Sequence, residues 1–146
     1  MTVHFNGQAI DLEYFGPGHT TGDAAVFFRG SNVVHVGDLF NARYPYIDAG
    51  NGGSLEGLIR VCRAIAGEID DSTRIVSGHG PVADRVAFAA YIDMLEKSYE
   101  QIARLKESGK TLEEVLAARP TADYDAEWGN PTLFITMAYQ TIAGPD

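Results

Sequence analysis

Residues 14–28 read YFGPGHTTGDAAVFF and place a single histidine, His19, in a glycine-rich turn between two apolar segments. Glycines beside a side chain let the backbone turn sharply and approach a bound group closely. The segment from Ala25 to Phe28 has the composition of a strand. The stretch therefore predicts a turn that leads into a strand, in which His19 is either a metal ligand or an ordinary polar turn residue.

Further strand signals lie on both sides of this stretch. Residues 3–15 predict a β-hairpin, because apolar residues alternate around Asn6-Gly7, a strong hairpin-turn signal. Residues 30–32 predict a second turn, with strands at 25–28 and 33–36. Residues 37–53 have no clear periodicity and predict a long irregular loop, which is usually functional or mobile.

Helical patterns follow in the remaining sequence. Ser54 is predicted to cap a helix whose apolar stripe extends to Ile69. A short strand at 73–77 precedes a long helix over 84–107. Two shorter helices are predicted after it, with N-terminal signals at Thr111, Glu114, Asn130 and Pro131. The order predicts an α+β (mixed α/β) fold, in which an antiparallel or mixed sheet carries its helices on one face.

The composition is that of one acidic globular domain over residues 1–146. The formal net charge of −9 argues against nucleic acid or an anionic membrane as the main partner, because both require a basic surface. Cys62 is the only cysteine, so it forms no disulfide within the chain, and it lies in an apolar helical stripe as a core residue. The first 15 residues contain neither a signal peptide nor a membrane span, which makes a cytoplasmic location the expectation.

Three segments share a layout in which a predicted strand runs into a glycine turn that carries a metal-ligating side chain. These side chains are His19, Asp38 and His79. Ligands at strand ends converge on one edge of a sheet, and two imidazoles with one carboxylate suit zinc, iron or manganese. Taken one at a time, each of these side chains is more often an ordinary polar residue of a turn. His4 and His35 lie within predicted strands and are expected to be surface or satisfied core residues.

The motifs GPGHTTGDAAVFF, VVHVGDLF and IVSGHGPV, in this order, resemble the later motifs of the metallo-β-lactamase superfamily, the broad group of metallohydrolases. The stretch GDLFNARYPYIDAGNGGSLEGLI is similar to an uncharacterised hydrolase-like branch of it. The resemblance implies an αββα sandwich with a two-metal site. It implies that His19 binds the first metal, Asp38 bridges both metals and is catalytic through them, and His79 binds the second.

The resemblance also implies that the segment after Asp38 lines a substrate mouth, with Tyr44, Tyr46 and Asp48 as substrate-binding residues. The alternative for Tyr44 and Tyr46 is that they pack under the loop against the next helix. The cofactor implied is zinc, with iron or manganese as alternatives, and a chain without bound metal is also considered.

The superfamily's earlier H-x-H-x-D-H motif does not occur in the 146 residues, so the chain resembles the C-terminal half of such a domain. We therefore expect an incomplete dinuclear site and an exposed sheet face. That face would be covered by a second copy in a homodimer, or by a separate chain that supplies the missing half. Three functions remain open: a metal-dependent hydrolase, a non-catalytic remnant or binding module of the same fold, and a protein in which zinc is purely structural.

Overall fold

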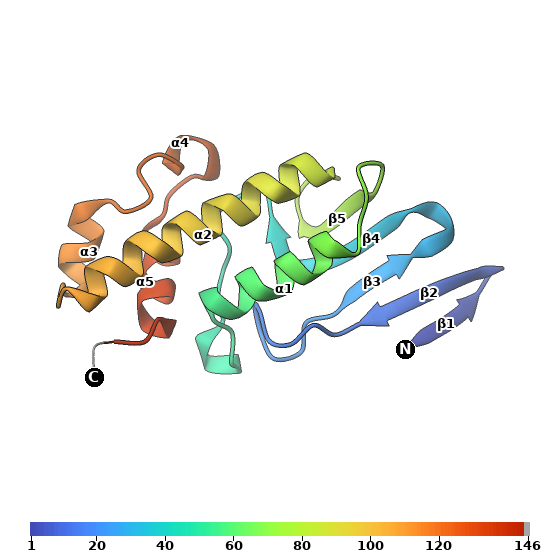
Figure 1. Ribbon diagram of the computed structural model, residues 1–146, viewed down its shortest axis with the longest axis horizontal. Helices are drawn as coiled ribbons and strands as arrows, with labels where there is room; N and C mark the ends of the chain where they lie inside the picture. Colours follow the sequence, from blue (N-terminus) through green and yellow to red (C-terminus); the bar gives the residue numbers. More distant parts are fainter. Residues whose placement is uncertain (145–146) are drawn as a thin grey trace.

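The computed structural model describes residues 1–144 and contains one five-stranded sheet with helices on one of its faces (Figure 1). The strands lie in the order of the sequence, namely β1 (Thr2–Phe5), β2 (Gln8–Glu13), β3 (Ala25–Phe28), β4 (Val33–Asn41) and β5 (Arg74–His79). Neighbouring strands are antiparallel except β4 and β5, which are parallel. The predicted mixed sheet is confirmed.

The two predicted tight turns join the strands as expected. Asn6 and Gly7 have φ angles of 49° and 74°, so both occupy the left-handed region that the turn of a two-residue hairpin requires. Asn32 is also left-handed, with φ of 49°, and reverses the chain between β3 and β4. Because asparagine and glycine tolerate this region, short-range sequence signals were sufficient here.

The prediction of a loop over residues 37–53 is wrong for its first part, because β4 continues to Asn41. A bulge with a left-handed Gly37 (φ 53°) breaks the alternation after His35. Beyond the bulge the strand pairs again, with Asn41 beside His79. The parallel partner β5 likewise extends past residue 77 to His79. Pairing between distant segments therefore overrides the glycine-rich local pattern.

Five α-helices complete the described chain. They are α1 (Leu55–Gly67), α2 (Arg85–Glu107), α3 (Leu112–Ala118), α4 (Asp125–Trp128) and α5 (Thr132–Thr141). The cap at Ser54 is confirmed, but α1 ends two residues before Ile69. The N-cap predicted at Asn130 is wrong: Pro131 takes that position, and Asn130 instead accepts a hydrogen bond from the amide of Thr132.

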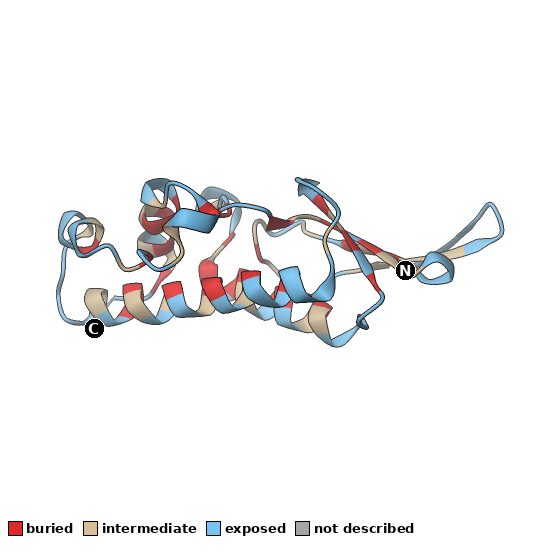
Figure 2. Ribbon diagram, turned by 90° about the horizontal axis from the view of Figure 1, so that it is seen from above, coloured by how far each residue is buried: buried red, intermediate tan, exposed pale blue. Residues whose placement is uncertain are grey.

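The core lies between the sheet and helices α1 and α2, while α3, α4 and α5 gather beyond one end of the sheet (Figure 1). Buried residues follow the inner sides of α1 and α2 (Figure 2). An aromatic cluster joins the sheet to α2 and α4; its members are Phe40, Phe88, Tyr91 and Trp128. Cys62 is fully buried, and burial raises the pKa of its thiol. No helix in residues 1–144 is long and apolar enough to cross a membrane.

Candidate metal site

The loop that carries His19 is organised by the carboxylate of Asp23. The amides of Gly18 and Thr20 each donate to Asp23 Oδ2 at 3.0 Å, and the Thr20 hydroxyl donates to Asp23 Oδ1 at 2.9 Å. Such bonds from a short acidic side chain to nearby amides stabilise a tight turn. Asp23 therefore holds in place the backbone on both sides of His19.

A second set of contacts joins this loop to the segment after β4. The His19 carbonyl accepts a hydrogen bond from the amide of Asp48 at 3.0 Å. Gly53 packs directly on the same carbonyl, and a Cβ at position 53 would lie 2.0 Å from the His19 oxygen. The close approach is possible only because residue 53 has no side chain. The two loops are thus locked together behind the imidazole.

Replacing Gly53 by alanine should destabilise the fold and displace the His19 loop. Because the obstructing atom is backbone, it cannot move aside alone, and overpacking of this kind costs about 1–3 kcal/mol. Gly67→Ala is the matched control, since nothing lies within 4 Å of a Cβ there. Gly67 ends α1, so its alanine variant should be stabilised by about 0.5–1 kcal/mol. Urea unfolding of both variants measures this, and equal stabilities would contradict the packing described.

The imidazole of His19 is oriented by a backbone carbonyl. Its Nδ1 lies 2.7 Å from the carbonyl oxygen of Tyr46, an acceptor, so Nδ1 carries the hydrogen. In the neutral ring this leaves the lone pair on Nε2, which faces Asp38. A carbonyl partner on the second ring nitrogen is the usual support of a metal-ligating histidine. A ring nitrogen with a lone pair that faces a carboxylate suits a metal cation between them.

Asp38 lies between the two histidines, in the irregular part of β4 that follows Gly37. Its Oδ2 is 3.8 Å from His19 Nε2, and its Oδ1 is 3.4 Å from His79 Nε2. Zinc–ligand bonds of about 2.1 Å at a tetrahedral angle put neighbouring ligand atoms about 3.4 Å apart. Gly78 leaves the room for this carboxylate, because a Cβ there would be 2.3 Å from Asp38 Oδ1. The separations therefore fit ligands of metal ions.

The three side chains differ in exposure, and they do not surround one point. The side chains of His19, Asp38 and His79 are 16%, 39% and 71% exposed. Within residues 1–144, no group of three or more His, Cys, Asp or Glu side chains is placed to hold one metal ion. Each histidine instead faces a different oxygen of the shared carboxylate. The arrangement fits one carboxylate between two cation positions, each incomplete.

A cavity of about 470 Å³ adjoins His79, and two of the three expected substrate-binding residues line it. Tyr46 is 51% exposed, and its ring lies 5.9 Å from that of His19 in an edge-to-face arrangement. Tyr44 is buried and stacks on Phe134, and its hydroxyl lies within hydrogen-bonding distance of Asp125. Burial is the main cause that raises the pKa of this phenol.

The third expected residue, Asp48, does not line the cavity. Its carboxylate accepts hydrogen bonds from the backbone amide and the side chain of Asn51. The cavity is also lined by residues that no motif in the sequence marked as part of the site. Arg43 follows β4, Asn130 lies two residues before α5, and α5 itself contributes Leu133, Phe134 and Met137. The residues of and before α5 are more than 90 positions from Asp38 in sequence, so only the folded chain brings them to the site.

The chain was compared with known proteins in sequence and in fold. No protein-family model matches the chain. It is 26% identical to hydroxyacylglutathione hydrolase from Synechococcus sp. (strain JA-2-3B'a(2-13)), with 90% of this chain and 53% of that protein covered. The chain thus spans about half the length of this curated relative.

Solved structures agree on the fold. A metallo-β-lactamase from Pontibacter korlensis matches with a TM-score of 0.55 at 17% identity, covering 66% of this chain and 45% of that one. The structure of TMB-1 matches with a TM-score of 0.51 at 18% identity, covering 61% and 41% of the two chains. The chain therefore has the metallo-β-lactamase fold over the part that these structures cover, and its sequence is similar to that of a hydrolase of the same superfamily.

Proposed function

We propose that this chain is a metal-dependent acyl hydrolase whose metal ligands are His19, Asp38 and His79. One observation carries the proposal: the two imidazoles face opposite oxygens of Asp38, and the His19 ring is fixed with Nε2 toward that carboxylate. Zinc suits this donor set, and iron or manganese are the alternatives. The two cation positions are incomplete in one chain, so further ligands come from another copy or another chain.

The residues of the site have separate roles in this proposal. A divalent metal supplies Lewis-acid chemistry, polarising the scissile carbonyl and stabilising the negative charge that develops on it. Asp38 holds the two cation positions together, and the Tyr46 carbonyl keeps His19 in the ligating tautomer. Tyr46 and His79 border the cavity, so a substrate seated there lies beside the ligands.

The residues that line the cavity favour an acyl substrate that carries a negative charge. Its apolar wall is formed by Leu133, Phe134 and Met137, while Arg43 is the one Lys or Arg side chain of residues 1–144 that lines it. An apolar wall with few polar groups is the usual form of a small-molecule site. The names of the relatives suggest two substrates to test, a hydroxyacylglutathione and a β-lactam. A cytoplasmic location belongs to the same proposal.

Hydrolysis assays on the zinc-supplemented chain test this function. We expect turnover of at least one of the two substrates, and a loss of about 100-fold or more in His79→Ala, because removing a group that acts on the reacting atoms typically costs that much. His4→Ala is the matched control, since His4 is an exposed residue of β1 and lies in none of the site contacts described. Equal rates in the two variants would contradict the assignment. Failure of the zinc-loaded wild type to hydrolyse either substrate would favour the alternative, a non-catalytic binding module.

A further inference from the structure

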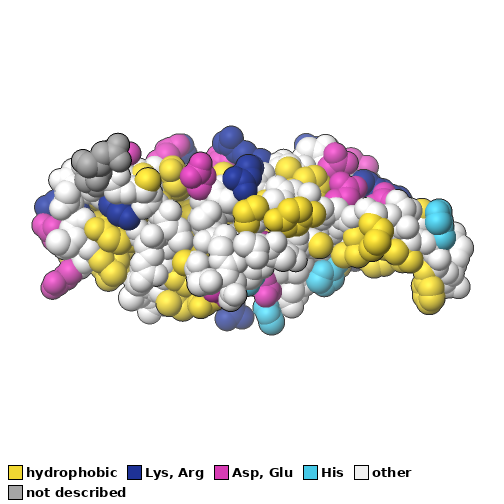
Figure 3. Space-filling model, turned by 90° about the horizontal axis from the view of Figure 1, so that it is seen from below, with side chains coloured by type: hydrophobic (Ala, Val, Ile, Leu, Met, Phe, Trp, Pro, Cys, Tyr) yellow, Lys and Arg dark blue, Asp and Glu magenta, His cyan; other side chains and the backbone are white. Residues whose placement is uncertain are grey.

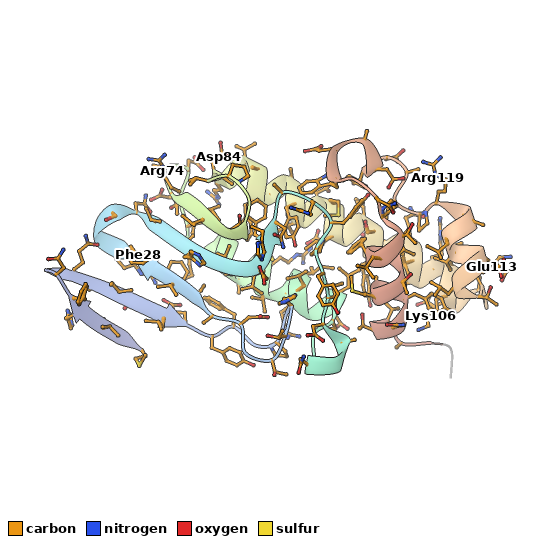
Figure 4. The ribbon with its side chains drawn as sticks, turned by 180° about the vertical axis from the view of Figure 1, so that it is seen from behind. Phe28, Arg74, Asp84, Lys106, Glu113 and Arg119 are labelled. Atoms are coloured by element: carbon orange, nitrogen blue, oxygen red, sulfur yellow. The ribbon has the colours of Figure 1, made fainter. Side chains whose placement is uncertain are left out.

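The sheet has one face that no helix of the described chain covers. Figure 4 views the molecule from that side, with the strands in front of α1 and α2 and Phe28 on the near face. Pairing fixes which residues share it: Val26 lies beside Leu12 and His35, and His35 beside Val76. We define the open face by its apolar side chains, which are Val3, Phe5, Ile10, Leu12, Val26, Phe28, Val33 and Val76.

These apolar side chains lie partly or largely in solvent. Val3 is 41% exposed and Phe5 is 71% exposed, and the other members are half-buried. Seen from below, apolar side chains gather over the strand-bearing end of the molecule (Figure 3). The largest apolar patch on a typical soluble monomer is only about 300–600 Å². A face that spans all five strands of the sheet therefore indicates a surface that another protein surface covers.

The charges on this side of the sheet limit the kind of partner. The chain has 20 acidic residues, but alternation along β2 turns Asp11 and Glu13 to the helix side, where both bond to Arg29. The ionisable side chains that the strand pairing places on the open-face side are His35 and Arg74. A chain of net charge −9 repels a second copy over most of its surface. This face lacks the carboxylates that would cause the repulsion.

We propose that a second copy of this chain covers the open face in a two-fold symmetric, sheet-on-sheet dimer. A two-fold interface brings the same patch of both copies together, so the patch has to be compatible with itself. An apolar sheet face without carboxylates meets that condition, and packing of two such faces is a standard arrangement.

The dimer also bears on the candidate site, although it does not depend on the proposed function. Asp38 lies in β4 just past its bulge, and His79 is the last residue of β5; both side chains remain partly or largely exposed. A second copy on the open face lies next to these two strands and is the nearest source of further ligands. Failure of metal binding would leave the dimer intact, and failure of the dimer would leave the Asp38 contacts unchanged.

Light scattering after size exclusion at micromolar concentration tests the proposal with a matched pair of variants. The wild type should have twice the chain mass of 15.8 kDa. Val26→Lys places a charge in the centre of the open face and should give a monomer. Val86→Lys makes the same change on α2, at a side chain that is 78% exposed, and should remain a dimer. Phe5→Lys is a second open-face variant at a position too exposed to be required for folding.

The outcomes separate the possible occupants of the face. A dimeric wild type that Val26→Lys and Phe5→Lys dissociate, with native circular dichroism, supports the second copy. A wild type that runs as a stable monomer and binds a dye specific for apolar surfaces overturns it and leaves another chain as the occupant. A dimer that Val86→Lys dissociates while the two open-face variants do not also overturns it.

Discussion

Zinc affinity is expected to fall by at least about 100-fold when Asp38 is replaced by alanine. Loss of even an outer partner of a metal ligand typically costs 10–100-fold in affinity, and Asp38 is the side chain that both histidines face. Without it, His19 Nε2 and His79 Nε2 have no common carboxylate, and neither cation position keeps an anionic ligand. Competition with a zinc-binding dye measures the change.

The fold of this variant should survive, which separates the metal effect from unfolding. The Asp38 side chain is 39% exposed and carries none of the loop bonds that Asp23 makes. Asp71→Ala is the matched control, because that carboxylate is 95% exposed and pairs only with Arg85 on the surface. An Asp38→Ala variant that binds zinc as tightly as Asp71→Ala would exclude Asp38 as a ligand.

The largest stability effect is expected for Phe88→Ala, which should cost about 3–5 kcal/mol. Phe88 is fully buried on α2, meets Phe40 of β4 edge-to-face at 5.4 Å between ring centroids, and stacks on Tyr91. Truncation removes the ring that joins helix to sheet and leaves a cavity in the core. The midpoint of urea unfolding should therefore fall steeply.

Val86→Ala is the control for that experiment, since Val86 lies on the same helix but is 78% exposed. Its effect should stay within about 0.5 kcal/mol, as for most surface substitutions. The comparison should be made at one protein concentration, because association would couple stability to concentration. A Phe88→Ala variant that loses less than about 1 kcal/mol would show that this aromatic cluster is not a centre of the core.

Local signals made much of the fold predictable. The hairpin turn needs left-handed backbone only at two adjacent positions, which Asn6 and Gly7 adopt readily. Ser54 and Thr111 cap their helices through hydrogen bonds to amides three residues further on. The extension of β4 past Gly37 was not predictable, because it depends on pairing with β5, far along the chain. The N-cap of α5 was also predicted wrongly, at Asn130 instead of Pro131. The sequence does not decide this, because Pro131 can stand either at the N-cap or at the first helical position.

The candidate site was likewise predictable only in part. His19, Asp38 and His79 were predicted as ligands from glycine-rich turns expected at strand ends. In the structure Asp38 lies 3.8 Å from His19 and 3.4 Å from His79, but it stands inside β4 and not in a turn after it. The carbonyl of Tyr46 that orients His19 was not predictable, because a backbone oxygen leaves no mark in the sequence. Neither was the wall of Leu133 and Met137, which reaches the site only through the packing of α5.

The central claim, that His19 and His79 are metal ligands through Nε2, is tested most directly by the ring nitrogen resonances of the four histidines during a zinc titration. The ¹⁵N shifts report the tautomer of each ring and the nitrogen that binds. We predict that His19 starts with its proton on Nδ1, and that zinc shifts Nε2 of His19 and His79 while His4 and His35 stay unchanged. Zinc that leaves all four rings unchanged, or that shifts His4 or His35 in their place, would contradict the account.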